Sequence, residues 1–254
     1  MKKTAEIFMI AAALTTVGAV AAQGPAVTVH FALKSSTVEA GVPLMVAVTV
    51  RNDTDAAQPV TIGRYEVDWT VRSRAGAEVA QWKPGGDFAS LGKYLAPHAE
   101  EEFTIVASGT ATILSPGEYE IVPRYRPLDI SERLPFTVVP GDAAVLGLRA
   151  QEFHDAAIIK GENGLRAAEA LAAIAYAVPT SQLCDVVERN PLTTYAIAPR
   201  LETEGGVDAV RCLIRIMSVA PVHGLGYAKP ALQRLRKSEK DPALRSEIEK
   251  AVGQ

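Results

Sequence analysis

The sequence predicts a two-part fold: an antiparallel, all-β sandwich over residues 25–140, followed by an all-α region of helical hairpins over 142–254. The main observation is a change of period. Apolar residues recur at every second position as far as about Val139, as in strands with one buried face, and at helical spacing after Pro140-Gly141. Turn motifs interrupt the first half, and helix-start motifs such as Asn190-Pro191 and Asp241-Pro242 punctuate the second.

Residues 1–22 have the pattern of a secretory signal peptide. Lys2 and Lys3 precede an apolar run from Ile7, and Ala19-Val20-Ala21 provides the small residues of a cleavage site. The run is about 16 residues long, shorter than the roughly 20 that cross a bilayer. We therefore expect a periplasmic or secreted protein, with no membrane span once the signal is removed.

The clearest strand lies at 65–72. Tyr65, Val67, Trp69 and Val71 alternate with polar residues, so one face should lie in the core and the other in water. The same reasoning places further strands at 27–34, 44–51, 59–62, 77–82, 101–106, 118–125 and 133–139. Asn52-Asp53-Thr54 matches a glycosylation sequon, but we interpret it as a turn between strands.

The stretch LSPGEYEIVPRYR at 114–126 places a Pro-Gly turn immediately before a strand. Pro116 and Gly117 suit the backbone angles of a tight turn. Tyr119 follows at the start of a late strand, where its hydroxyl can bond back to the chain as in a tyrosine corner. This stretch predicts architecture and carries no chemistry.

The second half predicts consecutive helices joined by short links. Capping residues, glycines and prolines divide it at intervals that suit antiparallel hairpins. The expected helices span 142–160, 165–177, 180–189, 191–204, 207–220, 227–238 and 241–252.

Two resemblances extend this interpretation. The segments VEAGVPLMVAVTVRN (38–52), LAPHAEEEFTI (95–105) and LSPGEYEIVPRYR resemble those of immunoglobulin-like sandwiches of bacterial exported proteins, although the paired strand cysteines of antibody domains are missing. Residues 197–201 and 230–245 weakly resemble HEAT-type repeats, which imply a concave surface for a protein partner. A compact helical bundle is the alternative for this half.

Cys184 and Cys212 are the only cysteines. An even pair in an exported chain suggests a disulfide, and two buried thiols are the alternative. We expect no metal site, because no CxxC or HxxxH spacing accompanies them, and we expect no cofactor.

Motifs of enzymes give little support for catalysis. The sequence lacks GxSxG, SxxK, HExxH, Walker and dinucleotide patterns, so we assign no catalytic residue. A hydrolase built on His154 and Asp155 is a minor alternative, because neighbouring helix residues point about 100° apart. We expect His154 to be a residue of the helix surface.

Trp82 and Phe88 flank a Pro-Gly-Gly loop and are the candidate partner contacts. Exposed rings there would offer contact area to a protein or to a sugar ring; the alternative is that both rings turn into the core. The net charge of −3 does not suggest a nucleic-acid partner.

The leading hypothesis is a non-enzymatic exported binding or scaffold protein that contacts another protein, with a groove where the two parts meet. A chaperone-like or inhibitor subunit of an exported enzyme system, offering an edge strand to its client, is the alternative.

Overall fold

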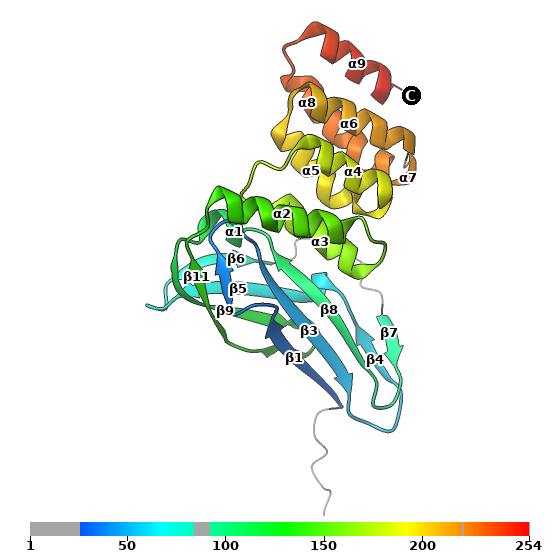
Figure 1. Cartoon of the computed structure of the whole chain (residues 1–254). Helices are drawn as coiled ribbons and strands as arrows, with labels where there is room; N and C mark the ends of the chain where they lie inside the picture. The colour runs from blue at the N-terminus through cyan, green and yellow to red at the C-terminus, as the bar shows by residue number, and fades with distance from the viewer. Residues whose placement is uncertain (1–25, 84–91, 220, 254) are drawn as a thin grey trace, which may run out of the picture.

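The structure is a computed structural model that describes residues 26–83, 92–219 and 221–253. A β-sheet region spans 27–139 and a helical region spans 143–252, which confirms the predicted fold class and the order of its parts. Figure 1 shows the sheets at one end of the molecule and the helices rising from them in a stack. The predicted signal peptide lies outside the described residues.

The β-region has two main sheets and one separate strand pair. The first sheet has the order β1-β3-β8, and the second has the order β2-β11-β9-β5-β6 with β10 beside β9; β4 pairs with β7. The first sheet contains β1 (Val27–Leu33), β3 (Leu44–Asn52) and β8 (Glu100–Ala107). The second contains β2 (Thr37–Glu39), β11 (Leu134–Val139), β9 (Gly117–Tyr125), β5 (Val67–Ser73), β6 (Glu78–Trp82) and β10 (Ile130–Ser131). The pair is β4 (Gln58–Thr61) and β7 (Gly92–Leu95).

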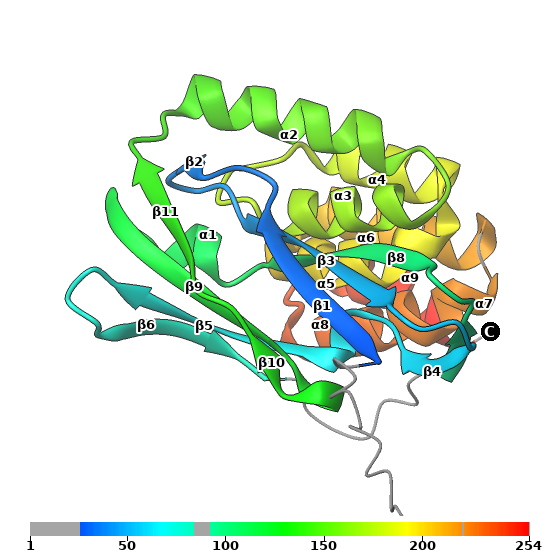
Figure 2. The same ribbon diagram turned by 90° about the horizontal axis from the view of Figure 1, so that it is seen from below.

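The two main sheets face each other and share one core (Figure 2). Alternate residues of β3, Leu44, Val46, Val48 and Val50, are completely buried, as their period of two requires. The pairing is antiparallel except between β2 and β11, which run parallel. The sequence did not predict β2, β7 or β10, which are two to four residues long.

Tyr119 makes the bond that the sequence suggested. Its hydroxyl donates to the carbonyl of Ser115 at 2.9 Å, and its ring stacks on Phe136 of the neighbouring strand with centroids 5.7 Å apart. The turn before β9 is therefore tied to the strand that follows it.

The prediction that residues 65–72 form one strand with its polar face in water is wrong in part. Tyr65 lies in a 3₁₀ turn (η1, Arg64–Glu66), and β5 begins only at Val67. Asp68 is only 7% exposed, because Arg124 of β9 binds its carboxylate with two N–H···O contacts of 2.6 and 3.1 Å. A cross-strand ion pair thus covers a polar residue that the alternation alone placed in water.

Asn52 ends β3 and is completely buried. Its Nδ2 donates to the carbonyls of Ala56, Leu95 and Ala96, and its Oδ1 accepts from both the amide and the hydroxyl of Thr54. The predicted turn at 52–54 is therefore correct. The same contacts leave Nδ2 inaccessible for glycosylation in the folded chain.

The phenol of Tyr125 should make stability fall at alkaline pH. Tyr125 is 1% exposed and donates to the carbonyl of Thr61; burial, with the nearby charge of Glu66, raises its pKa to about 12. Because the folded-state pKa lies above the ordinary value near 10, the protonated phenol contributes stability fully below pH 10 and loses it as pH rises toward 12.

We expect both the wild type and Tyr125→Phe to lose stability between pH 9 and pH 11. The loss in free energy of unfolding should be about 1 kcal/mol larger in the wild type. Urea titrations of both proteins at the two pH values measure this difference, because all other titrating groups are shared. Equal losses in the two proteins would contradict the assignment.

The helical region begins with α2, which Asp142 caps by accepting from the amides of Ala144 and Val145 at 2.9 Å. Gly164 lies inside α3 rather than in the link before it: a Cβ there would stand 1.8 Å from the carbonyl oxygen of Ile159, so only glycine allows this close approach. The main helices are α2 (Ala143–Ala157), α3 (Glu162–Ala173), α4 (Thr180–Arg189), α5 (Thr194–Glu204), α6 (Gly206–Val219), α8 (Lys229–Ser238) and α9 (Pro242–Val252). The short elements are α1 (Thr110–Ile113), η2 (Arg126–Leu128), η3 (Pro191–Thr193), α7 (Pro221–His223) and η4 (Gly224–Ala228).

The helices stack in two rows on a core of their own. Helices α2, α4 and α6 contact in succession along one row, and α3, α5 and α8 along the other. The buried residues of this core, Leu171, Leu183, Ile197 and Leu213 among them, are separate from those between the sheets. Each part therefore buries most of its own apolar side chains, as the two periods predicted; Val42, between β2 and β3, joins the core of the helices. No helix in the described ranges combines the length and the apolar character that crossing a bilayer requires.

The junction between the two parts is close and includes polar contacts. The amide of Ala175 donates to the carbonyl of Gly41 at 2.8 Å, and Arg149 of α2 binds Glu39 of β2 at 2.8 Å. Gly141 approaches Ala40 so closely that a Cβ would stand 2.3 Å from the carbonyl oxygen of that residue. These contacts fix the helical region against the β2–β3 end of the sheets.

Candidate binding groove between the sheets and the helices

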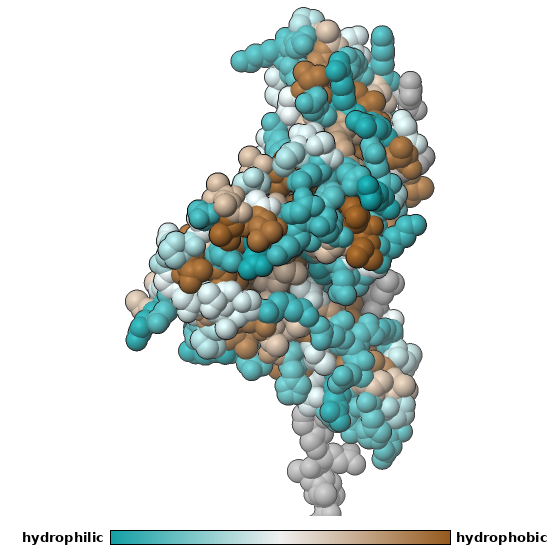
Figure 3. Space-filling model, in the orientation of Figure 1, coloured by the Kyte–Doolittle hydropathy of each residue, from teal (hydrophilic) through white to brown (hydrophobic). Residues whose placement is uncertain are grey.

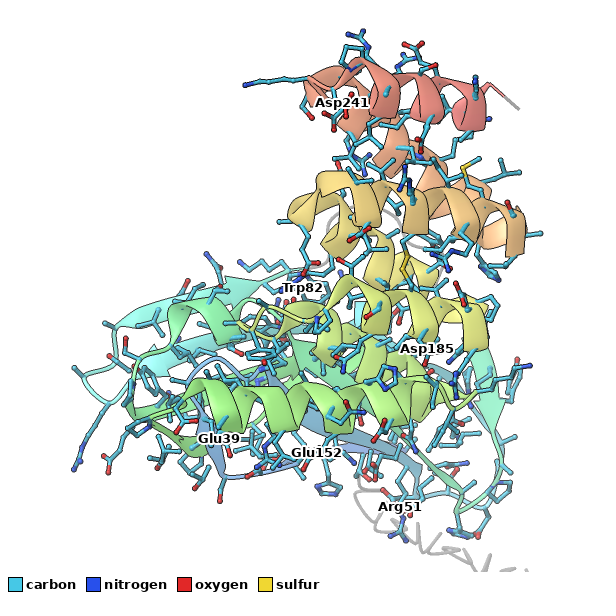
Figure 4. All side chains as sticks on the ribbon, turned by 45° about the horizontal axis from the view of Figure 1, so that its top comes forward. Glu39, Arg51, Trp82, Glu152, Asp185 and Asp241 are labelled. Atoms are coloured by element: carbon cyan, nitrogen blue, oxygen red, sulfur yellow. A yellow bond between two sulfur atoms is a disulfide. The ribbon has the colours of Figure 1, made fainter. Side chains whose placement is uncertain are left out.

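A groove of about 380 Å³ lies where the sheets meet the helices. Figure 4 shows Trp82, one of its lining residues, at this junction. Strands β5, β6 and β8 and the turn η1 form one wall, and α3 and α5 form the other. The lining residues are Arg64, Tyr65, Trp69, Trp82, Ile105, Val106, Ser108, Glu169, Ala172, Ala173, Tyr195 and Ala196.

The wall from the sheets is aromatic. Trp69 and Trp82 are paired directly across β5 and β6, so the two indoles lie side by side on the same face. Trp69 and Ile105 are 4% and 3% exposed, whereas Trp82 is half-buried. The deep side of the groove therefore reaches the core between the sheets.

The wall from the helices is built from small residues. Ala172 and Ala173 end α3, and Ala196 lies in the first turns of α5. Methyl side chains at these positions leave room opposite the indoles. Space therefore exists here because the residues on the helical side are small.

Arg64 reaches from η1 across the mouth of the groove. Its guanidinium lies 4.6 Å from the ring centroid of Tyr65 and 4.9 Å from that of Tyr195, and it donates to Glu169 and to the Tyr65 hydroxyl. Two aromatic faces and two acceptors thus hold the planar group in one orientation.

Glu169 is the centre of a network on the helical side. Its carboxylate accepts from Arg64, from Arg166 and from the Tyr195 hydroxyl at 2.7 Å, and its side chain is 10% exposed. Burial, with the charge of Glu169 beside it, raises the pKa of Tyr195. The three donors occupy this carboxylate and fix its position at the groove.

The sequence identified one of these residues. Trp82 lines the groove and packs in part against the core between the sheets, and its contact with a partner stays a prediction; Phe88 lies outside the described residues. Arg64, Glu169 and Tyr195 were missed. Arg64 and Glu169 are 105 residues apart in the sequence, and Glu169 and Tyr195 are 26 apart. The three residues come from three elements and form no motif, so only the tertiary structure brings them together.

Cys184 and Cys212 form a disulfide, so the structure has the bonded alternative and not two free thiols. The bond joins α4 to α6, neighbours in one row of the stack, and neither cysteine lines the groove. Its role here is structural.

His154 is not a surface residue as the sequence suggested. Its side chain is 12% exposed and lies between two carboxylates, Asp155 at 3.0 Å and Asp185 of α4 at 3.1 Å. The expectation failed because α4 packs against α2 and covers this position. The two ring nitrogens each have a carboxylate partner, so the cluster ties the helices together. Within the described ranges, no group of three or more His, Cys, Asp or Glu residues is arranged to hold a metal ion.

Comparisons with known proteins give only remote likenesses. No family model and no curated protein matches the chain. Among solved structures it is similar to a β-glucosidase from Listeria innocua, at 14% identity and a TM-score of 0.29 over 45% of this chain and 16% of that one. The alkylpurine DNA glycosylase AlkC of Pseudomonas fluorescens gives 16% identity and a TM-score of 0.29 over 45% of this chain and 31% of that one. The CARDB domain of a Pyrococcus furiosus protein, in complex with di-metal ions, gives 15% identity and a TM-score of 0.28 over 45% of this chain and 94% of that one.

The chain therefore spans 16% of the glucosidase and 31% of the DNA glycosylase. TM-scores below 0.3 assign neither a family nor an activity.

Proposed function

We propose that this chain is an exported, non-enzymatic binding protein that contacts another protein through the groove between its sheets and helices. The observation that carries the proposal is the groove itself, whose aromatic and small apolar lining surrounds one fixed guanidinium. Interfaces concentrate their binding energy in such places, where aromatic residues and arginine line a pocket for an anchor residue of the partner.

The chemistry of the groove favours binding over catalysis. The carboxylate of Glu169 is engaged by three donors, and the Tyr195 hydroxyl donates to it and has a raised pKa. With its raised pKa, the Tyr195 phenol is a poor proton donor at neutral pH. The network fixes the shape of the groove instead.

Two further features support the proposal. A disulfide between helices suits an oxidising compartment and so agrees with the signal peptide that the sequence suggests. The two-row stacking of helices favours the HEAT-type interpretation over a compact bundle, and the facing sheets suit an immunoglobulin-like sandwich. Both architectures commonly present surfaces to other proteins. On the face in Figure 3, hydrophobic patches interrupt a mainly hydrophilic surface over the helices.

Site-specific photo-crosslinking in the exporting cell tests the proposal. A benzophenone amino acid would replace Ala196 in the groove, His30 on the edge strand β1, or Ala144 on the exposed face of α2. We expect an adduct with one identified protein from position 196 and none from the control position 144. The reason is that a benzophenone reacts only with groups in direct contact.

An adduct from position 30 instead would favour the alternative, an accessory subunit that offers an edge strand to its client. Adducts from neither position, with the partner-free protein folded and exported, would contradict a protein-binding role for this groove.

A further inference from the structure

We propose that the segment of the partner which enters this groove carries a large apolar or aromatic side chain next to a carboxylate, and that Arg64 receives the carboxylate. The inference rests on the proposed function and specifies the chemistry of the partner. It follows from the shape of the apolar part, the orientation of Arg64 and the distribution of charge at the mouth.

The apolar part has room for an anchor residue and not for a whole structural element. Its space of about 380 Å³ is bounded by the Trp69 and Trp82 indoles on one side and by alanines of α3 and α5 on the other. A helix is about 10 Å across with its side chains and would not fit. One or two large side chains on an extended segment would fill the space and bury against the indoles.

Arg64 has donors to offer at the mouth of the groove. A guanidinium has five N–H groups, and Arg64 directs donors to two acceptors, Glu169 and the Tyr65 hydroxyl, among the residues that the structure describes. Its side chain is 29% exposed. Its guanidinium lies 4.6 and 4.9 Å from the ring centroids of Tyr65 and Tyr195, and its remaining N–H donors can bind a carboxylate with two parallel bonds.

The local charges favour an anion over a cation. The negative charge of Glu169 is balanced by contacts with both Arg64 and Arg166 and is mostly buried, so little of it remains for a basic ligand. An acidic segment would therefore meet the partly exposed guanidinium of Arg64, whereas a lysine or arginine would be repelled.

Selection of random linear peptides displayed on phage tests the inference with the full mature chain as bait. The wild type would be compared with Ala196→Trp, which fills the groove, and with the matched control Ala144→Trp on the exposed face of α2. We expect the wild type and the control to enrich peptides with an aromatic or large aliphatic residue beside Asp or Glu, and Ala196→Trp to enrich none of them.

Enriched peptides would then be synthesised with the acid intact or changed to the matching amide. Trp69 and Trp82 are the only two tryptophans of the chain and both line the groove, so intrinsic fluorescence reports occupancy directly. We expect the acid-to-amide change to weaken binding about tenfold or more at low salt. The change is made in the peptide and leaves the fold of the protein untouched.

The variant Arg64→Lys completes the comparison, because it keeps the charge but loses the planar fork. Its affinity should change by only about threefold or less when the peptide acid becomes an amide. If Arg64→Lys preferred the acid peptide over the amide peptide as strongly as the wild type does, Arg64 would not be the residue that binds the carboxylate.

The outcomes separate the inference from the function on which it rests. Peptides that need the open groove but carry no acid would overturn the inference and leave the proposed function standing. Peptides indifferent to Ala196→Trp, or no enrichment at all, would count against both. Enrichment of basic peptides that Ala196→Trp abolishes would show that the partner segment is cationic and would overturn the inference.

Discussion

Replacing Asn52 with alanine is expected to lower the free energy of unfolding by on the order of 3–5 kcal/mol. The carbonyl oxygen of Leu95 loses the Asn52 donor, those of Ala56 and Ala96 keep only the Thr54 hydroxyl and the Ala99 amide, and Thr54 loses the acceptor that closes its turn. Asn52 is completely buried, so no water replaces these partners without opening the loop. Each buried polar group left without a partner costs about 1–3 kcal/mol.

Urea titration followed by tryptophan fluorescence measures this loss, since both tryptophans lie in the β-region. Asn163→Ala is the matched control: Asn163 is exposed on α3, and its replacement should change stability by about 0.5 kcal/mol or less. If the two variants were equally stable, the buried network would not be what holds this end of β3.

Asn52→Asp sharpens the test. The Oδ1 contacts with Thr54 survive, but a carboxylate oxygen would face the three carbonyls in place of a donor. We expect a loss at neutral pH at least as large as that of the alanine variant, with partial recovery on acidification, because a protonated carboxyl can donate again. A variant as stable as the wild type at pH 7 would rule out the donor role of Asn52.

Reduction of the disulfide is expected to lower the stability of the helical region by about 3–4 kcal/mol. Cys184 and Cys212 are 28 residues apart, and closing a loop of this length restricts the unfolded chain by about that amount on the chain-entropy account. The bond joins α4 to α6, so its loss should act mainly on the helices.

Far-UV circular dichroism at the helical band and tryptophan fluorescence separate the two parts, because both indoles belong to the β-region. Under reducing conditions the urea midpoint of the helical signal should fall more than that of the fluorescence. The double variant Cys184→Ala/Cys212→Ala should be equally destabilised and indifferent to reductant. A wild type unaffected by reduction would show that the bond carries little of the stability.

Much of the architecture could be predicted from residue spacing because it depends on local patterns. The alternation in β3 and the helical spacing of Ala168, Leu171 and Ala172 are visible in short windows, and each implies a face that must be buried. Tyr119 was likewise predictable, since its acceptor, Ser115, lies only four residues away. The errors came where a neighbour from elsewhere intervened: Arg124 covers Asp68, and α4 covers His154.

The sequence by itself determined the two periods, their order along the chain and the turns between elements, since these require only contacts between near neighbours. Only the tertiary structure decided that Arg64, Glu169 and Tyr195 meet beside Trp69 and Trp82, because the spacing of residues along a chain does not encode which surfaces of two separately buried parts will touch. The groove exists because the helices dock on the sheets with alanines facing the indoles.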